Sequence, residues 1–143
     1  MEAQIITDRQ HWDDFVAASV CCNITQSYAW GELAQHVGAI EPLRIGVVDE
    51  AGNLCAVMLI LVTRAPIINK IYFYAPRGPI IDDPNSPAMT VLLNFVKAEA
   101  RKRGAFMLEV EPSVLADDVT WQQSLKRHGF RTNPYAKHVR HEW

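Results

Sequence analysis

Apolar side chains recur with helical spacing in four segments of the chain. In the second segment, Trp30, Leu33, Ala34 and Val37 follow the i, i+3, i+4, i+7 pattern of one helix face, so we expect this stripe to face the core. Residue types that cap helices stand beside each segment. The predicted helices run from a capping box at 7–10 to about Ser19, from Thr25 or Gln26 to Gly38, from Ser86-Pro87 to Gly104, and from Asp118 to His128.

Shorter apolar runs between these helices predict β-strands. Residues 43–49 and 54–63 are joined by Glu50-Ala51-Gly52-Asn53, a composition typical of a hairpin loop. The other predicted strands cover 4–6, 70–74, 105–111 and 130–143. About six strands interleaved with four helices indicate an α/β (α+β) fold, with a mixed sheet and helices on both of its faces.

Length, charge and composition narrow the class of protein. With 143 residues, 49% of them hydrophobic, the chain is expected to form one domain over 1–143 with a core of its own. A formal net charge of −2 gives no bulk attraction to nucleic acid. The N-terminal residues lack the pattern of a signal peptide, and the longest apolar run, 54–62, is far shorter than the ~20 residues that span a bilayer. We therefore expect a cytoplasmic protein with no membrane span.

The three cysteines agree with a reducing compartment. Their number is odd, and two of them, Cys21 and Cys22, are adjacent. A disulfide framework would need an even, spaced set. A metal site is not expected either, because His138 and His141 would face opposite sides of the predicted last strand.

The most informative segment is the end of the aromatic strand Tyr72-Phe73-Tyr74, where Pro76-Arg77-Gly78-Pro79 follows. Proline fixes φ and removes an amide donor, and glycine reaches backbone angles that other residues avoid. Arg77 is therefore expected in a stiff turn, where a guanidinium can bind a carboxylate or phosphate at low entropic cost. The alternative is that Arg77 pairs with Asp82 or Asp83 and pins the loop.

Two carboxylates share one face of a predicted strand. Glu109 and Glu111 alternate with the apolar residues Leu108 and Val110, so both point the same way. Two close carboxylates repel and raise one pKa, which suits a general base that takes a proton from an attacking amine. A strand whose polar face simply meets solvent has the same pattern, so both interpretations stay open.

The order of elements resembles that of the acetyltransferase superfamily (the GNAT, or acyl-CoA N-acyltransferase, fold). That superfamily binds the pyrophosphate of acetyl-coenzyme A on free backbone amides at a helix start, in a glycine-rich loop. Here the corresponding segment, 77–87, has one glycine, and prolines at 79, 84 and 87 remove donors. We therefore expect no coenzyme A binding in the usual mode and no cofactor.

Five blocks along the chain resemble the Fem family of peptidoglycan-bridge aminoacyltransferases. These blocks are Gln26 to Leu33, Pro42 to Gly46, Tyr74 to Pro79, Glu109 to Pro112, and Leu125 to Arg131. Members have two acetyltransferase-like halves and move an aminoacyl group from aminoacyl-tRNA to an amine on the stem peptide of a cell-wall precursor. The chain is similar to the N-terminal half. The resemblance implies that the anionic precursor peptide is a partner, with aminoacyl-tRNA as the second substrate if the chain is active.

The candidate site follows from the residues and the resemblance together. The candidate substrate-binding residues are Arg77, Gln26, Arg44 and Tyr74, and the candidate catalytic residues are Glu109 and Glu111. For Arg44, an ordinary solvated charge is the alternative. Ala34 stands where family members often have a lysine, and members are usually more than twice as long as this chain.

Two other functions fit the same pattern. The first is a noncatalytic binding or assembly module that forms a homodimer through its exposed final strand, because an unpaired sheet edge is a template for pairing. The second is a free-standing coenzyme A acyltransferase, which the prolines of the loop disfavour.

Overall fold

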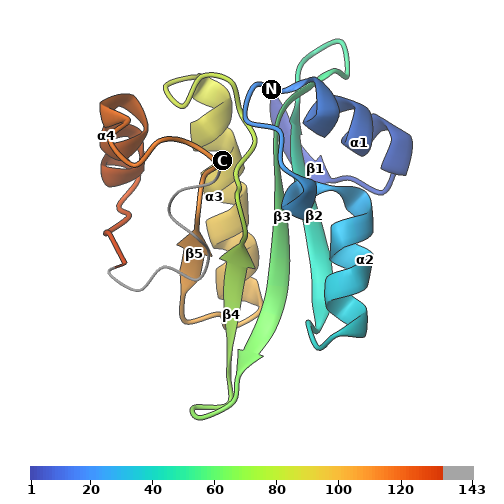
Figure 1. The fold of residues 1–143 in the computed structure, drawn as a ribbon, viewed down its shortest axis with the longest axis vertical. Helices are drawn as coiled ribbons and strands as arrows, with labels where there is room; N and C mark the ends of the chain where they lie inside the picture. Colours follow the sequence, from blue (N-terminus) through green and yellow to red (C-terminus); the bar gives the residue numbers. More distant parts are fainter. Residues whose placement is uncertain (134–143) are drawn as a thin grey trace.

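The computed structural model describes residues 1–133, and these residues build a single five-stranded sheet (Figure 1). The strands are β1 (Glu2–Ile5), β2 (Glu41–Val48), β3 (Leu54–Ala65), β4 (Lys70–Ala75) and β5 (Leu108–Val110). They lie in the order of the chain, with β1 to β4 antiparallel and β5 parallel to β4. The predicted mixed sheet and the hairpin between β2 and β3 are confirmed.

Helices cover both faces of this sheet (Figure 1). The helices are α1 (Arg9–Ala18), α2 (Tyr28–His36), α3 (Pro87–Lys102) and α4 (Val119–Arg127), with a short 3-10 turn, η1 (Ile24–Gln26), between α1 and α2. The α1 and α2 helices pack on one face, and α3 packs on the other. The predicted arrangement, a mixed sheet with helices on both of its faces, is confirmed.

Alternating strand residues supply a separate core to each face. The α3 face buries Ile45 of β2, Met58 and Ile60 of β3, and Phe73 of β4 against Leu92 of α3. The other face is built from residues of the opposite parity, including Val57 and Leu59, with Trp12 of α1. The central strands β2 and β3, whose residues are buried on both faces, therefore lie between the two layers of helices.

The start of α2 differs from the prediction. Thr25 and Gln26, expected to open this helix, lie in η1, and the Ser27 side chain caps α2 by accepting from the amide of Trp30 at 3.2 Å. The Asn23 side chain caps η1 in the same way, by accepting from the amide of Thr25. The two successive caps, Asn23 and Ser27, therefore separate the 3-10 turn from α2.

The predicted core stripe of α2 is wrong in two of its four positions. Leu33 is 54% exposed and Val37 is 77% exposed, whereas Gly31 and Ala34 are buried. A Cβ on Gly31 would lie 2.8 Å from the Cβ of Pro42, so the helix backbone approaches the sheet through its small residues. Close approach of the backbone turns the larger apolar residues outward.

The last two predicted strands also differ. Strand β5 covers Leu108–Val110 and not 105–111. The amides of Phe106 and Glu111, on either side of it, still donate to the carbonyls of Ile71 and Ala75 in β4. Residues 130–133 form no strand, and the remainder of the predicted strand at 130–143 lies outside the described residues. Over residues 1–133, no helix has both the length and the apolar character needed to cross a bilayer.

Candidate active site at the end of β4 and β5

The turn after β4 holds its arginine in an uncommon backbone conformation. Arg77 has φ +52°, in the left-handed region that side chains with a Cβ rarely adopt, and it is half-buried. Gly78, whose conformational freedom the sequence suggests as the reason for the turn, does not have a positive φ. Glycine is needed there for space, because a Cβ on Gly78 would lie 2.7 Å from Nε2 of Gln26.

Gln26 anchors this turn from beneath. Its side chain is fully buried, its Oε1 accepts from the amide of Leu59 at 2.8 Å, and its Nε2 donates to the carbonyls of Pro76 at 2.6 Å and Leu59 at 3.2 Å. Thr25 adds a second donor, from Oγ1 to the Pro76 carbonyl at 3.1 Å. Both donors of the Gln26 amide are therefore used within the fold, which favours a positioning role over direct substrate binding.

Arg44 lies on another part of the sheet. It is 8% exposed, its guanidinium stacks 3.6 Å from the centroid of the Tyr28 ring, and its Nη2 donates to the Tyr28 carbonyl at 2.7 Å. Burial lowers the pKa of Arg44 below its usual value. Arg44 is therefore not an ordinary solvated charge, which was the alternative left open by the sequence. It forms a buried contact between β2 and α2, separate from the Arg77 turn.

Tyr74, Glu109 and Glu111 come together where β4 and β5 run side by side. The strand register pairs Tyr74 with Glu109, and the Tyr74 hydroxyl donates to Oε2 of Glu111 at 2.7 Å. Glu109 is buried, and its Oε1 accepts from Nδ2 of Asn133 at 2.7 Å. The parity of these residues places them on the sheet face that carries α1 and α2.

The protonation of Tyr74 follows from this environment. Burial raises the pKa of the Tyr74 hydroxyl well above its usual value, and the hydrogen bond to Glu111 and the charges of Glu111 and Glu109 raise it further. Arg77 lowers the same pKa, so its charge acts on this group. The phenol thus stays protonated at neutral pH, where it acts as a hydrogen-bond donor and not as a base.

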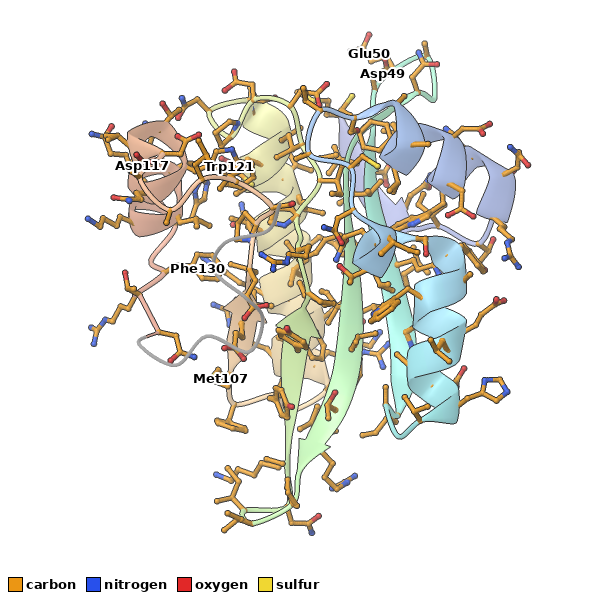
Figure 2. All side chains as sticks on the ribbon, in the orientation of Figure 1. Asp49, Glu50, Met107, Asp117, Trp121 and Phe130 are labelled. Atoms are coloured by element: carbon orange, nitrogen blue, oxygen red, sulfur yellow. The ribbon has the colours of Figure 1, made fainter. Side chains whose placement is uncertain are left out.

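Arg77, Glu109 and Glu111 line a large cavity of about 1200 Å³ between β5, α3 and α4. The apolar part of the lining includes Met107 and Phe130, which lie beside β5 in Figure 2. The charged part of the lining is mostly cationic and includes Arg77, Lys97, Arg101 and Lys126 with Glu109 and Glu111. The arrangement combines carboxylates that can accept a proton with cations that can hold an anion.

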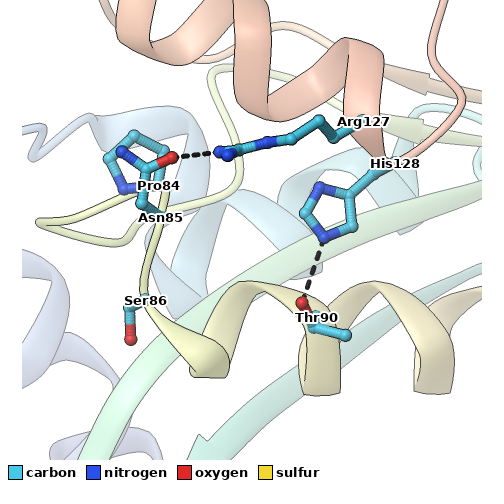
Figure 3. A pocket seen from close by; sticks show the side chains of 6 residues that line it. All are labelled: Pro84, Asn85, Ser86, Thr90, Arg127 and His128. Atoms are coloured by element: carbon cyan, nitrogen blue, oxygen red, sulfur yellow. Dashed lines mark hydrogen bonds between the residues drawn. The ribbon is translucent and has the colours of Figure 1, made fainter.

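A smaller pocket of about 310 Å³ lies at the start of α3 (Figure 3). Its polar groups bond to one another: Arg127 donates to Oδ1 of Asn85, and Thr90 and His128 are 3.2 Å apart. The Ser86 side chain accepts from the amide of Ala88 at 3.2 Å. Pro84, which lines this pocket, and Pro87, which follows Ser86, contribute no amide donors.

Sequence reasoning missed some contributors to the site. Asn133 and Thr25 make hydrogen bonds that join segments 24 and 51 residues apart, and nothing in their local sequence announces these partners. Among residues 1–133, no group of three histidine, cysteine or acidic side chains is arranged to hold a metal ion. His138 and His141 lie outside the described residues.

The chain is similar in sequence to proteins of one known family. A sequence model of the FemAB family matches residues 7–134. Lipid II:glycine glycyltransferases of Staphylococcus aureus strains MRSA252 and bovine RF122 / ET3-1 are each 29% identical over 132 residues, covering 92% of this chain but 31% of the relative. The chain therefore spans about a third of the length of these relatives.

Solved structures show the same relationship. The crystal structure of FemX superimposes with a TM-score of 0.82 at 29% identity, over 92% of this chain and 32% of FemX. A ribosomal-protein-alanine N-acetyltransferase from Brucella melitensis has a TM-score of 0.68 at 11% identity, covering 97% of this chain and 98% of its own, and shares the fold alone. The family match over most of the sequence and the fold together confirm the resemblance in the five sequence blocks: the chain belongs to the FemAB family.

Proposed function

We propose that this chain is the precursor-binding part of a peptidoglycan-bridge aminoacyltransferase that acts in the cytoplasm. The observation that carries the proposal is the convergence of Tyr74, Glu111 and the Arg77 turn at one end of β4 and β5, beside a mainly cationic cavity. The glycyltransferases with similar sequences are named for Lipid II, a cell-wall precursor. The fold supports the relationship, and the activity is our proposal for this chain.

The cations of the cavity suit an anionic precursor. A stem peptide ends in a carboxylate, and its nucleotide- or lipid-linked forms carry phosphates. Arg77 offers a fixed guanidinium, which can bind such groups through two parallel hydrogen bonds. Lys97 and Lys126 add positive charge from α3 and α4. In this proposal Arg77 and Tyr74 orient the precursor, while Gln26 holds the turn in place.

The carboxylates supply the proton acceptor for transfer. The acceptor amine reaches the site as an ammonium, which loses a proton to Glu111 or Glu109 before its nitrogen can attack. The nitrogen lone pair then forms a bond to the ester carbonyl carbon of an aminoacyl-tRNA, and the ester C–O bond breaks. The departing ribose oxygen of the tRNA takes up a proton. Tyr74, which stays protonated, holds the Glu111 carboxylate in place through its hydroxyl hydrogen bond.

A noncatalytic homodimer is the second candidate. The final strand that would form its interface lies outside the described residues, and within residues 1–133 the two edges of the sheet are β1 and β5. Light scattering after gel filtration measures the mass directly. A dimer that binds precursor without transferring an amino acid would support this second function over the first.

Calorimetric titration with a UDP-linked muramyl pentapeptide tests the main proposal. We expect micromolar binding, weakened at least tenfold by Arg77→Ala, which is about 1.4 kcal/mol. Arg9→Ala is the matched control, because Arg9 of α1 is an exposed arginine that pairs with Glu32 of α2, outside the cavity lining, and should not affect binding. Acetyl-coenzyme A serves as a control ligand. A folded protein that gives no heat with the pentapeptide would overturn the proposal.

A second measurement separates binding from chemistry. Glu111→Gln keeps the shape of the side chain and its ability to accept from the Tyr74 hydroxyl, but an amide cannot take up the proton of the amine. We expect its affinity for the pentapeptide to stay within about threefold of the wild type, because the cations carry binding. Transfer from aminoacyl-tRNA should fall by at least a hundredfold. Equal loss of both would assign Glu111 to binding alone.

A further inference from the structure

The connection between β3 and β4 carries two exposed isoleucines at its tip. Ile67 is 95% exposed and Ile68 is 51% exposed. The hairpin extends below the rest of the fold in Figure 1, at the end of β4 opposite to Arg77. Adjacent apolar side chains on a projecting tip contribute nothing to the core. Their exposure therefore indicates contact with an external partner.

The structure of the tip keeps both isoleucines outside the fold. Asn69 adopts φ +52°, and its amide donates to the carbonyl of Ala65 at 2.8 Å, which closes the turn. Nη1 of Arg64 donates to the main-chain and side-chain oxygens of Asn69 at 3.3 and 3.2 Å. The tip is therefore tied at its base by a basic residue.

The hairpin that carries the tip is positively charged, although the chain as a whole has a net charge of −2. Between Glu50 and Asp82 the sequence has no acidic residue, and Arg64 and Lys70 flank the isoleucines. Both basic side chains are exposed. Cations beside projecting apolar residues favour an anionic surface over a neutral one.

More apolar surface lies at the same end of the sheet. Phe106 is 47% exposed, its amide donates to the carbonyl of Ile71 at 3.0 Å, and its ring packs edge-on against Tyr72 with the centroids 6.4 Å apart. Aromatic rings of this kind favour the interface between lipid and water. The isoleucines at the tip and the aromatic pair behind them can therefore contact the same surface.

We propose that this end of the molecule docks on an anionic lipid bilayer. Ile67 and Ile68 enter the headgroup region, and Arg64 and Lys70 contact lipid phosphates. Two apolar side chains and a few cations give reversible binding and not a permanent anchor. The six residues of β4 would place Arg77 about 20 Å above the lipid surface. This inference goes beyond the proposed function and does not depend on it.

Vesicle flotation tests the proposal with the whole chain. The probes are vesicles of phosphatidylcholine alone and of phosphatidylcholine with about one third phosphatidylglycerol. We expect binding to the anionic vesicles, a roughly tenfold loss in the double variant Ile67→Ser, Ile68→Ser, and a smaller, salt-sensitive loss in Lys70→Gln. Leu115→Ser is the matched control, because Leu115 is 79% exposed in the loop before α4 and should not affect binding.

A depth measurement identifies the inserted residue. Ile67→Trp places a fluorophore at the tip, and brominated lipids in the anionic vesicles should quench the emission that this residue adds. Failure of the wild type to bind anionic vesicles, or equal binding by the double serine variant, overturns the proposal. A concentration-dependent dimer that the double serine variant loses would also overturn it, because the tip would then bind a second copy. These vesicles contain no precursor, so the outcome leaves the proposed function untouched.

Discussion

Gln26 donates a buried hydrogen bond of 2.6 Å to the carbonyl oxygen of Pro76, 50 residues further along the chain. The same side chain pairs with both main-chain polar groups of Leu59 in β3, and the indole of Trp12 donates to the main-chain oxygen of Gln26 at 2.7 Å. The turn that carries Arg77 is therefore fixed by the segment between α1 and α2. Any substrate contact of Arg77 depends on this distant support.

Removing the Gln26 side chain should lower the free energy of unfolding more than removing the side chain of a surface glutamine. Gln26→Ala leaves the amide and carbonyl of Leu59 and the carbonyl of Pro76 with fewer partners in a buried place. We expect the free energy of unfolding to fall by about 3 kcal/mol. Urea denaturation measures it. Gln35→Ala, which removes a long exposed hydrogen bond of 3.4 Å to Ile40, should change it by less than about 0.5 kcal/mol.

Gly78 should be intolerant of a methyl group because of Gln26. The added Cβ of Gly78→Ala would lie 2.7 Å from Nε2 and 2.9 Å from Cδ of the glutamine, so we expect a loss of about 2 kcal/mol. In a Gln26→Ala background the same substitution should cost much less, because the obstructing side chain is gone. A double-mutant cycle measures this coupling, and simple additivity of the two losses would contradict the contact.

Local signals account for the parts of the fold that the sequence predicted well. Ser86 caps α3 and Pro87 opens it, as expected from residues that satisfy or lack the first amide donors. Glycine and asparagine in 50–53 mark the hairpin of β2 and β3, whose strands have the expected bounds to within two residues. Each of these features depends on neighbours within a few positions.

Tertiary contacts account for what the sequence did not show. The helical stripe of α2 could not indicate that Gly31 would touch the sheet while Leu33 and Val37 point away, because this depends on how closely the helix approaches β2. The roles of Gln26 and Arg44 were also hidden, since both act on partners that only the folded chain brings near. The pairing of Glu109 and Glu111 on one face was visible because strand alternation is local.

Tyr74 should make the protein less stable in alkali. Burial and the neighbouring carboxylates raise the pKa of its hydroxyl in the folded state above the ordinary value of 10.0. Below that value both states are protonated and the contribution is complete. As pH rises beyond it, the unfolded chain loses the proton while the folded chain retains it, so stability falls. Tyr74→Phe should therefore flatten the decline of unfolding free energy above pH 10, measured by denaturation at several pH values. Parallel curves would contradict the raised pKa.

Arg77 should illustrate a conflict between stability and function. At φ +52° the backbone of a residue that carries a Cβ is strained by roughly 1 kcal/mol, whereas the backbone of glycine is not. We therefore expect the free energy of unfolding of Arg77→Gly to be about 1 kcal/mol higher than that of Arg77→Ala. This order should hold even though glycine makes the unfolded chain more flexible.

Asn94 provides the matched comparison for this substitution, because it is exposed in the middle of α3, where the order should reverse and alanine should be the more stable by about 1 kcal/mol. Both Arg77 variants should lose affinity for the muramyl pentapeptide to the same extent, since both lack the guanidinium. If alanine is the more stable residue at both positions, Arg77 is not held in the left-handed conformation. If the glycine variant is the more stable at 77 and still binds weakly, the fold maintains a strained backbone there to present the guanidinium to the cavity.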